Sequence, residues 1–169
     1  MNRSLSELGN DEVARLILRK LWQLQDAGGV SMGRSPRSVF LESAINILPM
    51  PVRNCDAFGT QELLEEVKKR RASIPPKLGS VRYVRRIGKR TLAILLLQEL
   101  LAWYREDAKK DPQQALTVET RMTETVLRLM PLPRGFKRSA SWSAEALVEQ
   151  SRIRLRIASN RRFKRRFGY

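Results

Sequence analysis

The chain has 169 residues, a length that suits about one domain with a single core. Hydrophobic residues make up 42% of it, and three Trp, five Phe and three Tyr supply large core anchors, so the composition argues against disorder throughout. Charge is the outlier, because 33 Lys and Arg against 17 Asp and Glu give a formal net charge of +16. A partner rich in negative charge is the first expectation.

The chain has few of the residue types that catalysis and metal binding commonly use. The chain has no histidine, the commonest general base and metal ligand, and its single cysteine, Cys55, cannot build a zinc site or an internal disulfide. No glycine-rich phosphate loop with its lysine occurs. We therefore expect no enzyme activity, no metal and no cofactor.

The expected location is intracellular. A lone cysteine fits a reducing compartment, and the first residues lack the apolar core of a signal peptide. The longest apolar stretch is shorter than the roughly 20 residues that a transmembrane helix needs. We expect a protein of the nucleus or cytoplasm, or of the interior of a virion, that is neither secreted nor membrane-spanning.

Three amphipathic helices are predicted in the first part of the chain. Asn10 can cap the first, Ser35 followed by Pro36 is a helix start signal, and Thr60 can cap the third. Apolar residues recur at helical spacing in each of them. The predicted ranges are 10–25, 36–48 and 60–71.

A loop at 73–79 separates these helices from an apolar stretch at 92–104 in which only two residues are polar. Paired prolines exclude helix from the loop, which we interpret as a connection inside one domain rather than a domain boundary. The apolar stretch predicts a helix that is buried on most of its surface. Either one central helix runs over about residues 80–109, or Gly88 divides it in two.

A fifth helix is predicted between the Asp-Pro pair at 111–112 and a second Pro/Gly loop at 131–138. The segment 143–150 is typical of a helix. The next residues, 152–157, alternate between arginine and an aliphatic residue with the period of a strand. We favour helix here and keep a short strand as the alternative.

Together these elements predict an all-α fold, a compact bundle of about six helices around the buried central helix. One core of this kind is enough for a chain of this length. Residues 1–151 are expected to form a single helical domain, and residues 152–169 a basic C-terminal tail with interleaved aromatic residues.

Positive charge is concentrated in two segments. Residues 68–90 hold ten Lys and Arg and residues 152–166 hold eight, neither with an acidic residue, while the rest of the chain has a net charge of −2. Arginine outnumbers lysine 24 to 9, and its planar guanidinium pairs with phosphate bidentately and stacks on bases. The predicted contact residues are Lys68, Lys69, Arg70, Arg71, Arg82, Arg85, Arg86, Lys89, Arg90, Arg152, Arg154, Arg156, Arg161, Arg162, Phe163, Lys164, Arg165, Arg166, Phe167 and Tyr169.

These features predict a non-enzymatic protein that binds nucleic acid, RNA in preference to DNA. Affinity would come from phosphate contacts and counterion release with weak sequence preference, and Phe163, Phe167 and Tyr169 would stack on the bases of a single strand. An economical basic chain of this kind suits a small viral or phage accessory or packaging protein, one that acts in host–virus interaction.

A helical adaptor is the alternative. It would dock on an acidic protein partner, and the basic tail would then serve as a nuclear localisation signal. A homo-oligomer is compatible with either function. Binding to an anionic membrane surface ranks last, since basic clusters there also need an exposed apolar face or a lipid anchor.

Overall fold

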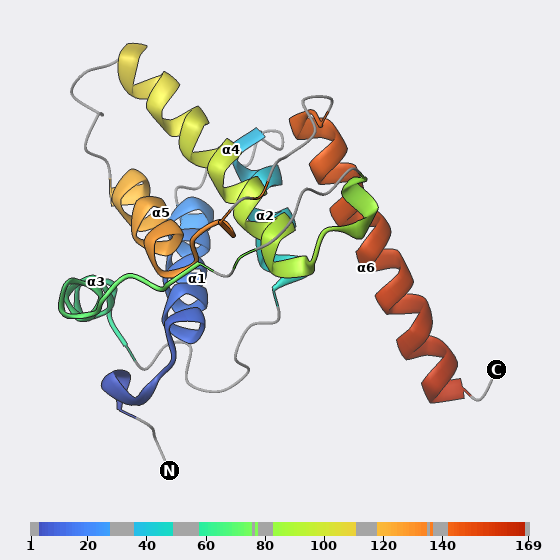
Figure 1. Cartoon of the computed structure of the whole chain (residues 1–169), viewed down its shortest axis with the longest axis horizontal. Coiled ribbons are helices and arrows are strands. Elements are labelled where there is room, and N and C mark those ends of the chain that lie inside the picture. Colours follow the sequence, from blue (N-terminus) through green and yellow to red (C-terminus); the bar gives the residue numbers. More distant parts are fainter. Residues whose placement is uncertain are drawn as a thin grey trace.

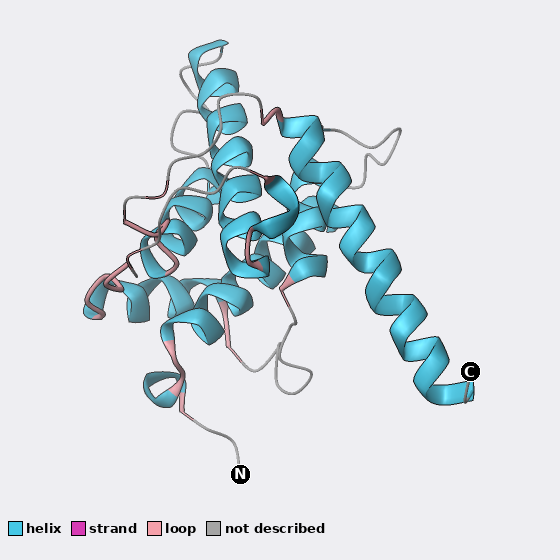
Figure 2. Cartoon of the chain, turned by 45° about the vertical axis from the view of Figure 1, so that its right-hand side comes forward, coloured by secondary structure: helices cyan, strands magenta, loops and turns pink. Residues whose placement is uncertain are grey.

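The computed structural model describes residues 4–27, 36–48, 58–75, 77, 83–110, 118–134, 136 and 142–167. Within these residues the chain is all-α, as predicted: six α-helices and two short 3-10 helices form a bundle, and no strand occurs (Figure 2). The elements in chain order are η1 (Leu5–Glu7), α1 (Asn10–Ala27), α2 (Pro36–Ile47), α3 (Thr60–Lys69), η2 (Val84–Arg86), α4 (Lys89–Lys110), α5 (Val118–Leu129) and α6 (Ala144–Phe167).

Helix α4 is the buried centre of the bundle, which confirms the prediction for residues 92–104. Ten of its residues are buried, and from Leu92 to Leu97 every side chain is at most 2% exposed. Helices α2, α5 and α6 pack against it. Because each fully buried leucine contributes roughly 1.5–3 kcal/mol of transfer free energy, this helix is the main source of hydrophobic stabilisation.

Of the two alternatives for the central helix, one continuous helix over about residues 80–109 is wrong and a break at Gly88 agrees with the structure, because α4 begins only at Lys89. The preceding 3-10 helix η2 ends at Arg86, and the next residue, Ile87, has an extended backbone with ψ of 139°. This bend places the Ile87 side chain in the core, where it is 4% exposed. The carbonyl of Gly88 then accepts the first hydrogen bond of α4, from the Leu92 N–H at 3.0 Å.

The start of α1 also differs in detail from the expected cap. Asn10 is the first helical residue, and its side-chain amide donates to the Ser73 hydroxyl at 2.7 Å instead of capping the helix. The Gly9 N–H donates to the Glu12 carboxylate at 2.8 Å, which satisfies one of the free donors at the helix end. Asn10 therefore ties α1 to the segment that follows α3.

Helix α6 runs without a break through residues 152–157, so the favoured helix is confirmed there and the alternative of a short strand is wrong. Ser143 caps the helix, accepting a hydrogen bond from the Ala146 N–H at 3.2 Å. Ile153 and Ile157 are 39% and 46% exposed. The period-two pattern does not match burial here, because Arg154 and Leu155 are the half-buried residues of this stretch and both isoleucines are exposed.

The two ends of the bundle are built from different helices (Figure 1). Helix α3 packs on α1, α5 and η1, whereas α6 packs on α2, α4 and η2. The described parts of the two Pro/Gly loops are not helical, and a single parallel bridge joins them at Lys77 and Arg134. Arg70 and Arg90, near the two ends of the first basic segment, both contact the start of α1, at Asn10 and Asp11, whereas η2 between them contacts α6.

Candidate nucleic-acid interface

The second half of α6 leaves the bundle and ends far from the other helices (Figures 1 and 2). We call its residues 156–167 the arm. The arm contains no acidic residue. Its cations are all exposed, and none has an ion-pair partner among the described residues; they are Arg156, Arg161, Arg162, Lys164, Arg165 and Arg166.

Arg154 anchors the base of the arm on the 3-10 helix η2. Its Nη2 donates to the carbonyl oxygens of Val84, Arg85 and Ile87, at 3.3, 3.5 and 2.5 Å. Partial burial lowers the pKa of the Arg154 guanidinium, although arginine stays charged at neutral pH. This contact brings together two basic segments that lie about 70 residues apart in the sequence.

The η2 helix adds two exposed arginines and an aromatic ring to the base of the arm. The guanidinium carbons of Arg85 and Arg86 lie 5.4 and 6.0 Å from the centroid of the Tyr83 ring. Such cation–π contacts attract the guanidinium groups to the ring and restrain the two arginine side chains. Tyr83 is 46% exposed.

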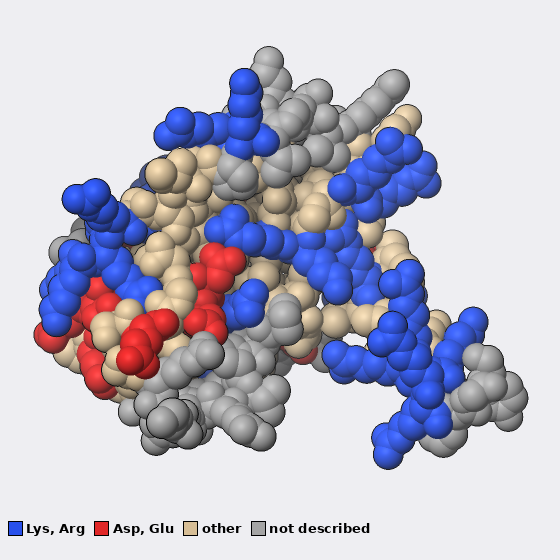
Figure 3. All heavy atoms as spheres, turned by 60° about the horizontal axis from the view of Figure 1, so that its bottom comes forward, with Lys and Arg blue, Asp and Glu red and all other residues tan. Residues whose placement is uncertain are grey.

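Sequence reasoning missed Tyr83, which is not among the predicted contact residues. The available signal was an aromatic residue followed within three positions by two arginines and then by Gly88, a combination that favours an exposed turn. The arm cations together with Arg85 and Arg86 form what we call the α6–η2 surface. Figure 3 shows Lys and Arg gathered along the arm and at its base, with Asp and Glu gathered on the other side of that view.

Arg70 lies away from this surface and is occupied inside the protein. Its guanidinium donates to the carbonyl oxygens of Leu5 and Leu8, at 2.8 and 2.6 Å. It also donates to the side chains of Asn10 and Glu66, at 3.2 and 3.0 Å. With so many donors committed, Arg70 joins the N-terminal turn to α3 and is poorly placed to bind phosphate.

Arg90 has a similar internal role. It forms a bidentate ion pair with Asp11 of α1, at 3.1 and 3.2 Å. Arg152 is exposed and makes a long ion pair with Glu149, at 3.8 Å. Lys89 is exposed at the first position of α4.

The remaining predicted residues are divided between the other end of the bundle and the part of the chain that is not described. Lys68, Lys69 and Arg71 are exposed at the end of α3, which does not adjoin α6. Arg82 and Tyr169 lie outside the described residues, as do the side chains of Phe163 and Phe167. The structure thus joins the second basic segment to only part of the first.

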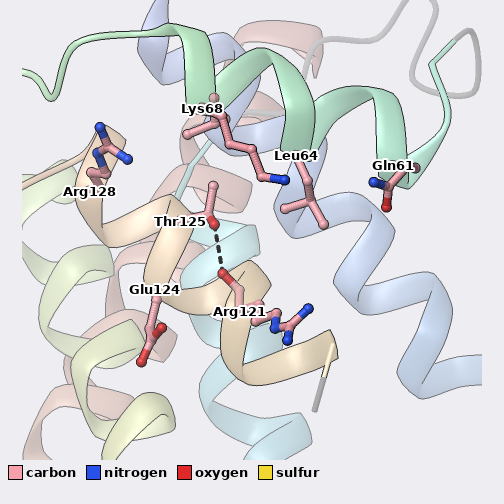
Figure 4. A pocket seen from close by; sticks show the side chains of 8 residues that line it. Gln61, Leu64, Lys68, Arg121, Glu124, Thr125 and Arg128 are labelled. Carbon is pink, nitrogen blue, oxygen red and sulfur yellow. Dashed lines mark hydrogen bonds between the residues drawn. The ribbon is translucent and has the colours of Figure 1, made fainter. Parts of the chain in front are cut away.

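A groove of about 340 Å³ lies between α3 and α5 (Figure 4). Val67, which is 3% exposed, and Leu64 provide its apolar side. Its acidic residue, Glu124, is paired with Arg105 at 3.1 Å. The polar and charged residues that line it are Gln61, Lys68, Arg121, Glu124, Thr125 and Arg128.

Fold and surface together define an all-α bundle that carries a cationic helical arm. A scan against protein-family models and searches of the curated proteins and of the solved structures find no match to this chain. In the described part of the chain, no three His, Cys, Asp or Glu side chains lie together as metal ligands, and no helix has both the length and the apolar composition needed to cross a membrane. The functional argument therefore rests on the arrangement of the charged side chains.

Proposed function

We propose that this protein binds nucleic acid through the α6–η2 surface. The observation that carries the proposal is the arm, a helix that leaves the bundle with six exposed cations and no acidic residue. Helices in proteins gain most of their stability from packing an apolar face, yet the arm leaves the bundle and Ile157 at its base is 46% exposed (Figure 2). An external polyanion accounts for this concentration of arginine better than stability of the fold does.

At the base of the arm, several side chains are already held in position before any ligand binds. Arg154 fixes the direction in which α6 leaves η2, and Tyr83 holds the guanidinium groups of Arg85 and Arg86 against its ring. Side chains that are ordered before binding lose less entropy when they meet a phosphate. The α6–η2 surface thus combines the exposed charges of the arm with two arginines held in place at its base.

The expected energetics are those of counterion release. The six arm cations with Arg85 and Arg86 can reach about eight phosphates, which predicts that log affinity falls with log salt with a slope of about −7. A protein with this many contacts loses roughly a factor of 10³ to 10⁵ in affinity between 50 and 200 mM salt. Sequence preference should be weak, because phosphate contacts carry no base information.

Fluorescence anisotropy tests the proposal, with labelled single-stranded RNA, duplex RNA and duplex DNA titrated across a salt series. The full chain is compared with a chain that ends at Leu155, which loses the arm but keeps Arg154 on η2. We expect steep salt dependence for the full chain and a much flatter dependence for the shortened one. Weak binding of the full chain to all three ligands at near-physiological salt would contradict the proposal.

A second candidate function is the docking of an acidic protein segment, and the α3–α5 groove favours it. Lys68, Arg121 and Arg128 surround an apolar side formed by Leu64 and Val67. The charge of Glu124 is already neutralised by its ion pair, so the groove offers net positive charge beside apolar surface. An acidic peptide with one or two aliphatic anchors complements both features.

A labelled glutamate-rich peptide with two leucines tests this second function. We expect the triple variant K68Q/R121Q/R128Q to lose most of the binding and R161Q/R165Q/R166Q, which removes the same charge from the arm, to keep it. Equal losses in the two variants would mean that the peptide responds only to net charge. No binding to the unaltered chain would also remove the groove from consideration.

A further inference from the structure

The cations of the arm are distributed around the whole helix. With successive residues about 100° apart around the axis, the six cations from Arg156 to Arg166 leave no gap wider than about 80°. Arg156 and Arg166 lie on one side, and Arg161 and Arg165 lie about 160° away on the other. A helix that contacted a flat ligand would use only one of these sides.

A ligand that neutralises both sides must have negative charge on both sides of the helix. A single strand lies along one face, whereas a groove of a duplex has a phosphate backbone on each wall. The arm is free of the bundle over its length, so two walls can approach it (Figure 2). The distribution of charge therefore favours a duplex over a single strand.

The dimensions of the arm select between the two kinds of duplex. An α-helix with its side chains is about 10–12 Å wide, and the major groove of B-form DNA is about 12 Å wide. The major groove of A-form RNA is deep and too narrow for side chains to read. The twelve residues of the arm extend about 18 Å, which corresponds to about five base pairs of DNA.

We propose that the arm enters the major groove of duplex DNA, with Arg85 and Arg86 on the phosphate backbone beside the point of entry. This inference rests on the proposed function and specifies its substrate class. It also reverses the preference for RNA that the aromatic residues of the sequence suggested. The arm binds as a helix that is already formed and continuous with the bundle.

Two double variants with matched charge test whether both sides of the arm are used. R156Q/R166Q removes two cations from one side of the arm, and R161Q/R165Q removes two from the other side. Each variant should make the slope of log affinity against log salt shallower by about 2. K69Q/R71Q removes the same charge from α3 and should leave the slope unchanged. If one arm variant weakens binding and the other binds like the unaltered chain, the ligand lies on one side and the groove placement is wrong.

The choice of duplex is tested with a labelled DNA duplex, an RNA duplex of the same sequence, and the same DNA duplex with glucosylated hydroxymethylcytosine, whose sugar fills the major groove. We expect the RNA duplex and the glucosylated DNA to bind at least about tenfold more weakly than plain DNA, at equal phosphate charge. Equal binding to plain and glucosylated DNA would overturn the groove placement and leave the nucleic-acid function standing. No binding to any of these ligands would overturn the proposed function itself.

Discussion

Helices α4 and α6 are the two longest in the described chain, with 22 and 24 residues, yet they occupy opposite environments. Helix α4 buries ten residues, whereas α6 reaches the core only near its start, through side chains such as Leu147 and Val148. The arm of α6 has a cation at half of its twelve positions. Helix formation is therefore common to both, and side-chain chemistry decides whether a helix is buried in the core or exposed on the surface.

The largest expected effect comes from breaking the core at α4. Leu96 is 0% exposed, and Leu96→Ala should lower the free energy of unfolding by about 2–5 kcal/mol, because it leaves a cavity. Ile157→Ala in the arm, where the residue is 46% exposed, should stay within about 0.5 kcal/mol of the unaltered chain. Urea unfolding followed by circular dichroism measures both. A comparable loss from Ile157→Ala would show that the arm packs on the protein.

Arg70 tests whether a cation inside the bundle has a structural role, in contrast to the binding role proposed for the arm cations. Arg70→Ala removes the donor for two carbonyls and leaves the half-buried Glu66 unpaired, so we expect a loss of about 2–4 kcal/mol in unfolding free energy. The neighbouring Lys69→Ala is the control and should have little effect on stability. Affinity for nucleic acid, measured by anisotropy below the unfolding transition, should be the same in both variants. A selective loss of affinity in Arg70→Ala would return this residue to the interface.

Tyr104 reports on the polar edge of the α4 core. Burial raises its pKa from 10.0 to about 12, with a small contribution from Glu119, while a hydrogen bond from Gln25 acts in the opposite direction. Since the folded-state pKa lies above the unfolded value, the stabilisation of about 2–3 kcal/mol is fully present below pH 10 and is lost as the pH rises through 12.

Ultraviolet absorbance of tyrosinate during an alkaline titration checks this prediction. A late step near pH 12 should occur in the unaltered chain and be absent in Tyr104→Phe. Complete ionisation of the tyrosines near pH 10 while the helices remain folded would contradict the burial of this phenol.

A smaller loss of stability than at Leu96 or Arg70 is expected where α6 meets η2. Arg154→Met keeps the aliphatic stem but removes a donor from three carbonyl oxygens, of which that of Val84 still accepts from the Ile87 N–H. We expect a loss of about 1 kcal/mol, since the site is only partly buried. Arg154→Lys keeps the charge and should recover only part of the loss, because an ammonium group lacks the fork of donors. If Arg154→Met also leaves nucleic-acid affinity unchanged, the direction of the arm is set by other contacts.

Much of the bundle follows from local sequence. The apolar stretch at 92–104 identified the buried helix, and helix starts at Pro36 and Ser143 were visible as single-residue signals. The break before Lys89 was left open because residues on both sides of Gly88 have helical spacing. It is decided by the burial of Ile87, which depends on the packed core rather than on local preference.

The candidate site was harder to predict, because its geometry comes from long-range contacts. Arg70 and Arg85 belong to the same basic segment, but Arg70 donates to carbonyls at the N-terminal turn and Arg85 is exposed beside the arm. Nothing in their immediate neighbours separates these two roles. The alternation at 152–157 suggested a strand. A helix that is mostly exposed does not need its apolar residues at helical spacing, so the pattern was misleading here.

The most direct test of the central claim asks whether the arm, rather than net charge, binds nucleic acid. Two variants lose the same five charges: R161Q/R162Q/K164Q/R165Q/R166Q in the arm and K68Q/K69Q/R71Q/R121Q/R128Q at the α3–α5 end. The measurement is the salt dependence of anisotropy with whichever nucleic acid the unaltered chain binds most tightly. We predict that the arm variant has a slope of log affinity against log salt that is shallower by about 4 to 5, while the other variant stays near the unaltered chain. Equal changes in the two slopes would contradict a dedicated surface on α6.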